Sequence, residues 1–197
     1  MTYTYLLAGE NLELAEAELN GFLKSQNIDE SAKRDGRLAE TEAQPGQLKR
    51  LALTHEVTEK ITETDPEELE IDYRPESSFA VRVENLSEHE IDSKELEKRI
   101  GQTIESETNT VDLENPETVI KAYIVDEKII LGEVVEDIDR GLFQKRKNQE
   151  RPFSSPISLD PVLARVMVNL SEVSAGEKIL DPFCGTGGLL IEAGLCG

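Results

Sequence analysis

The stretch that decides the fold is ILDPFCGTGGLLIE, residues 179–192, near the end of the sequence. It places a short apolar run before Asp181, a glycine-rich turn and a second apolar run. Glycine has no Cβ, so such a turn bends sharply and lets a ligand approach the backbone closely. A helix after the turn would direct free N–H groups and its positive dipole end at a polar or anionic group. This order predicts a nucleotide-like ligand at the edge of an open sheet.

Two common glycine motifs do not fit this turn. A dinucleotide fingerprint, G-x-G-x-x-G, would need glycine where Leu190 stands, and a phosphate-binding P-loop would need Gly-Lys-Ser/Thr. The run DPFCGTGG, residues 181–188, instead resembles the first motif of class I S-adenosylmethionine-dependent methyltransferases, in the form of amino-group methylases acting on nucleic acid. The resemblance implies that S-adenosylmethionine is the cofactor and is held by Asp181, Phe183, Gly185, Thr186, Gly187 and Gly188. The alternative is a purely structural strand-to-helix turn.

Strands and helices alternate along the sequence, which is typical of α+β and α/β folds. Residue alternation and β-rich composition predict strands at 2–7, 51–53, 79–83, 111–113, 119–125, 129–135 and 178–180. Asp35-Gly36 indicates a hairpin turn, and Pro45-Gly46 a loop. The acidic residues 62–78, which include two prolines, are expected to be a linker or exposed connection.

Three helices are expected from the spacing of apolar residues and from caps. The first covers 12–22, with Glu13, Glu16 and Glu18 on its solvent side. The second follows a capping box at Asp92 and stops at Gly101. The third follows the Asp160-Pro161 N-cap. Its expected apolar face is Val162, Leu163, Val166, Met167 and Leu170.

The charge balance is strongly acidic, with 41 Asp and Glu against 21 Lys and Arg and a net charge of −20. Such a protein repels nucleic acid on average. At about 1 M salt the Debye length falls to ~3 Å, so the self-repulsion fades. We therefore hypothesise a halophilic source, with an acidic but otherwise ordinary protein as the alternative.

The excess of acidic residues lies almost entirely in residues 1–139, and the remainder is close to neutral. Between positions 140 and 151 only Glu150 opposes a cluster of five basic residues, which are Arg140, Lys145, Arg146, Lys147 and Arg151. Phosphates are bound by Lys and Arg, so this cluster is the predicted RNA-binding segment. A solvated loop that balances an acidic protein is the alternative.

Upstream sequence carries a second resemblance. Residues 151–153 and 158–170 are similar to the lead-in of the archaeal tRNA (guanine-10-N2) methyltransferases and their eukaryotic relatives, although Ser155 stands where a histidine is frequent. Residues 61–150 resemble a THUMP domain, through the strand at 79–83, the helix ending at Gly101, the strand pair within 119–135 and the closing segment 139–146. THUMP domains bind RNA.

The resemblance implies three parts. Residues 1–60 would be an α+β ferredoxin-like unit, 61–150 an α/β THUMP domain, and 151–197 the start of a Rossmann-like class I methyltransferase domain. The implied function is S-adenosylmethionine-dependent N2-methylation of a guanine in tRNA, at position 10, with this chain supplying tRNA binding and part of the cofactor site. The alternatives are a stand-alone THUMP RNA-binding module without catalysis, or an rRNA or DNA amino methylase.

No catalytic residue is assigned. Related enzymes orient the amino nitrogen with an Asp/Asn-Pro-Pro-aromatic loop. The Asp-Pro and Asn-Pro pairs of this sequence, at 65, 115, 160 and 181, all lack the second proline. We therefore expect a fragment that is inactive alone and that exposes Leu189, Leu190, Ile191 and Leu195.

Other features exclude several classes of protein. No apolar run approaches the roughly 20 residues of a membrane helix, and Met1–Leu12 does not have the features of a signal peptide. Cys184 and Cys196 make no disulfide framework and are expected to pack, while His55 and His89 lack metal-ligand spacing and are expected at the surface. We expect a cytoplasmic monomer that binds tRNA and has no membrane or metal partner.

Overall fold

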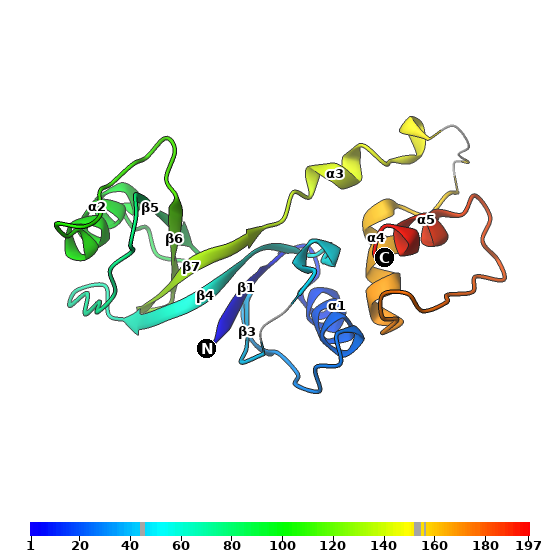
Figure 1. Cartoon of the computed structure of the whole chain (residues 1–197), viewed down its shortest axis with the longest axis horizontal. Helices are drawn as coiled ribbons and strands as arrows, with labels where there is room; N and C mark the ends of the chain where they lie inside the picture. Colours follow the sequence, from blue (N-terminus) through cyan, green and yellow to red (C-terminus); the bar gives the residue numbers. More distant parts are fainter. Residues whose placement is uncertain (44–45, 152–154, 156) are drawn as a thin grey trace. The chain divides into compact units, whose positions relative to one another are not determined.

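The computed structural model describes residues 1–43, 46–151, 155 and 157–197. The chain forms two compact units. The terminal unit contains Thr2–Val57 and Glu136–Gly197, and the middle unit contains Thr58–Val135 (Figure 1). The expected division at residues 60 and 150 stays a prediction. Pro45, Pro152 and Phe153 lie outside the described residues.

The terminal unit has a sheet with the strand order β2-β3-β1-β4. β1 pairs antiparallel with β3, and β2 pairs antiparallel with β3. Gly36 adopts a left-handed φ of 54° at the turn between β2 and β3, as the Asp35-Gly36 signal predicts. The strands are β1 (Tyr3–Leu7), β2 (Lys33–Asp35), β3 (Leu38–Thr41) and the beginning of β4 (Thr54–Thr64).

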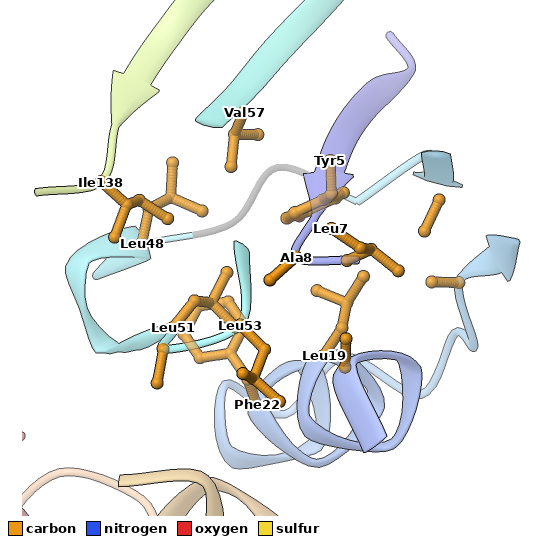
Figure 2. Close-up of a cluster of buried hydrophobic side chains, with 14 of the residues drawn as sticks. Tyr5, Leu7, Ala8, Leu19, Phe22, Leu48, Leu51, Leu53, Val57 and Ile138 are labelled. Atoms are coloured by element: carbon orange, nitrogen blue, oxygen red, sulfur yellow. The ribbon is translucent and has the colours of Figure 1, made fainter. Parts of the chain in front are cut away.

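Helix α1 (Leu12–Ser25) builds the core of the terminal unit with this sheet. Its N-cap is Asn11, whose side chain accepts a hydrogen bond from Leu14 N. Figure 2 shows Leu19 and Phe22 of α1 directed at Tyr5, Leu7 and the loop before β4. The spacing of apolar residues therefore predicts this face of the helix correctly.

Glu18 is wrong as a solvent-side residue, because its side chain is fully buried. Its carboxylate accepts hydrogen bonds from Ala52 N at 2.9 Å, Leu53 N at 2.8 Å and Asn169 Nδ2 at 2.8 Å. Two backbone N–H groups of the loop that leads into β4 would otherwise be unsatisfied. This need explains the burial of a charged residue on an otherwise apolar helix face.

The second half of the terminal unit is helical. Its helices are α3 (Gly141–Gln144), α4 (Pro161–Leu170) and α5 (Gly188–Gly194), and it contains the 3-10 turn η2 (Asn148–Glu150), whereas the 3-10 turn η1 (Leu48–Arg50) precedes β4 in the first segment. The Asp160 side chain caps α4 through Val162 N, as the sequence predicts. α4 crosses α1 at Gly21, where an added Cβ would lie 2.5 Å from Asn169 O. The absence of a side chain at Gly21 therefore permits this close crossing.

The expected apolar face of α4 is mostly wrong. Leu163, Met167 and Leu170 are exposed. The buried residues are Pro161, Ala164, Arg165, Val166, Val168 and Asn169. Both the exposed and the buried residues of α4 recur at helical spacing, so each set forms one face of the helix. Only the element that packs against α4 determines which face is buried.

The middle unit has the strand order β4-β7-β6-β5. β5 pairs parallel with β6, with Phe79 opposite Thr118, and β6 pairs antiparallel with β7. Helix α2, capped by Asp92, packs on β5 and contributes Leu96, Ile100 and Ile104 to the core. The elements are β5 (Phe79–Asn85), α2 (Ser93–Ile104), β6 (Thr118–Val125) and β7 (Lys128–Asp137), together with the rest of β4.

Several expected boundaries are corrected. β4 runs on to Thr64, into the expected linker, and α2 continues past Gly101 to Ile104. Residues 51–53, 111–113 and 178–180 are not strands. Val111 makes only an isolated bridge with Phe79, and no described strand pairs with 178–180. An apolar run becomes a strand only when a neighbour satisfies its backbone groups.

Candidate functional site

The glycine loop makes two left-handed bends before α5. Asp181 Oδ1 accepts a hydrogen bond from Phe183 N at 3.0 Å, and Gly187 N donates to Cys184 O at 2.7 Å. Gly185 and Gly187 have φ values of 50° and 75°. Residues with a Cβ are strained in this region, so both positions favour glycine.

A pocket of about 390 Å³ opens beside the loop. Its lining comes from two segments, residues 155–159 without the undescribed 156, and the loop from 181 to 189. A hydrogen bond of 2.8 Å between Ser158 Oγ and Thr186 Oγ1 joins these segments. Among the expected cofactor residues, the structure places Asp181, Phe183, Gly185, Thr186 and Gly188 in this lining.

Apolar side chains around the pocket are open to solvent. Phe183 is 92% exposed and Ile157 is 93% exposed, although both line the pocket. Leu190, Ile191 and Leu195 of the α5 region are also exposed, as the sequence predicts, while Leu189 is partly covered. The free cysteine Cys184 lies exposed in the loop, whereas Cys196 is buried and burial raises the pKa of its thiol. The expected packing role is therefore correct for Cys196, which is buried, and wrong for Cys184, which is exposed.

The predicted RNA-binding segment does not present five equivalent cations. Arg140 donates from Nε to Ala52 O at 2.9 Å, lies 3.4 Å from His55 Nε2, and pairs with Glu10 at 3.4 Å. His55 is therefore half-buried against Arg140 rather than a free surface residue, whereas His89 is exposed. The guanidinium of Arg140 is occupied in holding the turn between β7 and α3.

Arg146 is also bound within the protein. Its Nε and Nη2 atoms donate to the two carboxylate oxygens of Glu192 at 2.8 and 3.1 Å. Its guanidinium lies 4.8 Å from the centroid of the Phe143 ring. Lys145 and Lys147 are exposed, and no ion pair involves them among the described residues. These two lysines are the cations of the segment that can reach an external phosphate.

Arg151 behaves differently from the other four. Its Nε donates to Arg146 O at 2.7 Å. Its Nη1 and Nη2 atoms are buried and have no hydrogen-bond partner among the described residues. Nη1 lies 3.4 Å from the position that a Cβ would take on Gly188. Arg151 therefore lies against the glycine loop, and its terminal nitrogens do not face solvent.

A buried carboxylate links the loop helix to the rest of the unit. Glu192 of α5 is fully buried and pairs with Arg165 Nη2 of α4 at 2.9 Å in addition to Arg146. Arg165 Nη1 also lies 3.4 Å from Arg50 O. Neither Glu192 nor Arg165 is among the residues predicted from the sequence. Both are charged residues within short apolar helices, and this position indicates a buried ion pair.

Comparison with known protein families matches both parts of the chain. The THUMP domain model matches residues 53–133, and the model of the RMKL-like methyltransferase domain matches residues 148–197. A THUMP domain followed by the beginning of a methyltransferase domain is the class that the fold and the glycine loop define. The resemblance stated from the sequence is thereby confirmed.

Two curated archaeal relatives match along the whole chain, and both are named tRNA (guanine(10)-N2)-dimethyltransferase. The protein of Methanothermobacter thermautotrophicus is 42% identical over 210 residues, which cover 100% of this chain and 62% of the relative. That of Methanocaldococcus jannaschii is 35% identical over 224 residues, covering 98% and 64%. The chain is similar to these tRNA (guanine-10-N2) dimethyltransferases along its whole length and spans just under two thirds of the length of these relatives.

A solved structure shares the fold. The crystal structure of TrmN from Thermus thermophilus superposes with a TM-score of 0.58 at 23% identity, covering 100% of this chain and 63% of TrmN. The fold class expected from the sequence is therefore confirmed. Within the described residues, no helix is long and apolar enough to cross a membrane. The same residues contain no group of three or more metal-ligating side chains.

Proposed function

We propose that the protein methylates the N2 amino group of guanine 10 in tRNA with S-adenosylmethionine. In this proposal the present chain supplies tRNA binding and part of the cofactor site. The observation that carries the proposal is the pocket beside a loop whose two left-handed glycines leave the backbone accessible. The names of the two archaeal relatives supply the substrate and the position.

The residues of the loop fit S-adenosylmethionine. An added Cβ at Gly185 would meet only Phe183 O at 3.9 Å, and one at Gly187 would meet nothing within 4 Å, so the inner surface of the turn is open. Asp181 lies half-buried at the start of the loop, and the hydroxyl groups of Ser158 and Thr186 also line the pocket. Such polar groups around a pocket suit a ligand that carries both hydroxyl and charged groups. When bound, the cofactor supplies an activated methyl group.

The contribution of this chain is binding and orientation. No Asp/Asn-Pro-Pro-aromatic loop occurs in the 197 residues, so we assign no catalytic residue here. Lys145 and Lys147 provide local positive charge on a protein whose net charge is −20, which directs RNA phosphates to this segment. The middle unit, matched by the THUMP model, is proposed to contribute further RNA contacts.

The proposal is tested with the full-length gene product, radiolabelled S-adenosylmethionine and a tRNA transcript. We expect label to enter a transcript that carries guanine at position 10, and to be lost when adenine replaces that guanine. Equal labelling of both transcripts would assign the activity to another nucleotide. Binding of tRNA without any labelling would favour a THUMP module that only binds RNA.

We further propose that the protein works as a monomer in a cytoplasm of high salt concentration. The support is the acidic composition, with a sequence pI of about 4.5. High salt screens repulsion between exposed carboxylates and leaves short interactions, such as phosphate to lysine, operative only at close range. Sedimentation at several protein concentrations in high KCl tests the monomer, and a concentration-dependent mass would contradict it.

A further inference from the structure

Helix α5 contacts the rest of the terminal unit through a buried charged side chain. The helix has seven residues, of which Gly188 and Glu192 are buried, whereas Leu190 and Ile191 are exposed. An isolated helix of fewer than ~12 residues is marginal in water, so α5 needs tertiary contacts to form. Glu192 supplies such contacts, and they also hold the end of the glycine loop, because Gly188 is both the last glycine of the loop and the first residue of α5.

Two arginines from different elements hold the Glu192 carboxylate. Arg146, which follows α3, donates from Nε and Nη2 to its two oxygens at 2.8 and 3.1 Å, and Arg165 of α4 pairs with it through Nη2 at 2.9 Å. Both guanidinium groups also lie over the Phe143 ring, 4.8 and 5.7 Å from its centroid. A bidentate pair fixes the direction of a carboxylate as well as its distance. The two arginines therefore determine how α5 is oriented.

Stability alone does not account for this buried triad of Arg146, Arg165 and Glu192. Taking charges out of water costs free energy that their mutual attraction often fails to recover, and well-packed apolar side chains of similar volume are frequently as stable or more stable. Apolar contacts, however, are not directional, whereas a forked ion pair has one favoured geometry. The triad is therefore better suited to fixing one position of α5 than to stabilising the fold.

The contacts of Arg146 connect it to the cofactor pocket. Each of its three guanidinium nitrogens already donates within the chain, Nε and Nη2 to Glu192 and Nη1 to Leu142 O at 3.1 Å. Glu192 lies about one helical turn after Gly188, and Gly188 lines the pocket beside the glycine loop. A rotation of α5 would therefore move Gly188 and change the shape of this pocket.

We infer that Arg146 and Arg165 are positioning residues of the cofactor pocket, which act on the glycine loop through Glu192, and that Arg146 does not bind RNA phosphate. The inference rests on the proposed function, because it assumes that the pocket holds S-adenosylmethionine. It divides three successive cations between two ligands. Lys145 and Lys147, which are exposed, face RNA, and Arg146 between them supports the cofactor site.

The first test changes Arg146 in the full-length gene product and measures both ligands. Arg146→Gln should weaken S-adenosylhomocysteine in calorimetry about 10-fold, the size of loss that follows removal of groups that orient metal ligands. It should leave unchanged both the affinity for a tRNA transcript in filter binding without cofactor and its salt dependence. Arg146→Lys, which keeps the charge but not the fork, should give an intermediate loss. Lys145→Gln should give the reverse pattern, with weaker tRNA binding and unchanged S-adenosylhomocysteine binding.

A matched control and a triple variant separate positioning from stability. Arg34→Gln breaks an ion pair with Glu16 in the same unit, and the Arg34 side chain is 26% exposed against 24% for Arg146. This control should change the affinity for neither ligand. The triple variant Arg146→Met, Arg165→Leu and Glu192→Leu replaces the triad with apolar side chains. Its melting temperature should stay near or above that of the wild type, while its affinity for S-adenosylhomocysteine falls.

Unchanged affinity for S-adenosylhomocysteine in Arg146→Gln, or in a folded triple variant, overturns the inference. Weaker tRNA binding with a shallower salt dependence in Arg146→Gln also overturns it, because Arg146 would then be a phosphate ligand. So does an equal loss of S-adenosylhomocysteine affinity in Arg34→Gln, since any broken ion pair would then suffice. Should the triple variant not fold, the single variants at Arg146 decide. A wild type that binds no S-adenosylhomocysteine refutes the proposed cofactor itself, which is a distinguishable failure.

Discussion

Glu18 shows how a single buried carboxylate can hold a loop in place. It satisfies Ala52 N and Leu53 N, and it receives the side-chain amide of Asn169. We predict that Glu18→Ala lowers the free energy of unfolding by about 3 kcal/mol or more, because several buried donors each lose a partner worth ~1–3 kcal/mol. Urea unfolding followed by circular dichroism measures the change. Glu13→Ala, on the exposed side of the same helix, should stay within ~0.5 kcal/mol of the wild type.

The same residue gives a pH dependence with a definite sign. Burial raises the pKa of Glu18 above its ordinary value, and the hydrogen bonds from Ala52, Asn169 and Leu53 only partly oppose this. The folded state therefore holds a proton that the unfolded state releases, and stability is lost as pH rises through the folded pKa. We predict that Glu18→Gln gains stability relative to the wild type as pH rises from 5 to 8. A difference that is constant across this range would contradict the burial effect.

At the scale of helices, Gly21 of α1 and Gly101 of α2 can be compared directly, because both are helical glycines with different surroundings. An alanine Cβ at Gly21 would lie 2.5 Å from Asn169 O, whereas one at Gly101 would meet nothing within 4 Å. We predict that Gly21→Ala destabilises the protein by roughly 1–3 kcal/mol, because α1 and α4 must separate. Gly101→Ala should stabilise it by up to ~1 kcal/mol through helix propensity. Thermal unfolding distinguishes the two, and changes of equal sign would refute the close crossing of α1 and α4.

A separate prediction concerns tRNA binding by the basic segment, residues 140–151. Lys145→Ala with Lys147→Ala should weaken tRNA binding and reduce the steepness of its salt dependence by about 0.9 for each phosphate that is no longer neutralised. Filter binding over a KCl series measures both quantities. The charge-matched control replaces Lys33 and Lys49, exposed lysines outside the segment, with alanine. An equal loss in the control would mean that only net charge matters and would remove the segment from the RNA site.

The sequence predicts those elements whose signals are local. The Asp160 cap, the Asp35-Gly36 turn and the glycine loop are all determined by neighbouring residues, and the structure contains them. The buried side of α4 could not be predicted in this way, because Asn169 and Arg165 are buried by partners on α1, α5 and the loop before β4. Residues 178–180 have strand composition, but strand formation depends on pairing, which sequence pattern does not report.

In the functional site, too, the sequence predicts local features but not the contacts between distant residues. Residue type identifies the glycine loop and the basic cluster, because glycine conformation and positive charge are intrinsic properties. The division of the cluster into Arg140 and Arg146, which are bound within the protein, Lys145 and Lys147, which are exposed, and Arg151 could not be predicted. It depends on where Glu10 and Glu192 lie in the folded chain.

At the scale of the whole molecule, net charge determines how stability responds to salt. With 41 acidic and 21 basic residues, we predict that raising KCl from 0.1 to 2 M increases the melting temperature by at least several degrees. The reason is that the Debye length falls from ~10 Å to less than ~3 Å, which removes most of the repulsion between exposed carboxylates. A series in sucrose at matched viscosity controls for solvent effects that do not involve charge. Full stability in the absence of salt would contradict the halophilic proposal.

The terminal unit draws its core from both ends of the chain, since Ile138, Phe143 and Val166 pack with Tyr5 and other residues of the first segment. On the ribosome, therefore, the first 57 residues cannot complete their folding until the middle unit has been made and the chain beyond residue 136 has emerged. At ~5–20 residues per second this delay lasts several seconds. During that interval the nascent helix and strands present bare apolar faces, which makes them a natural substrate for chaperones that bind emerging chains.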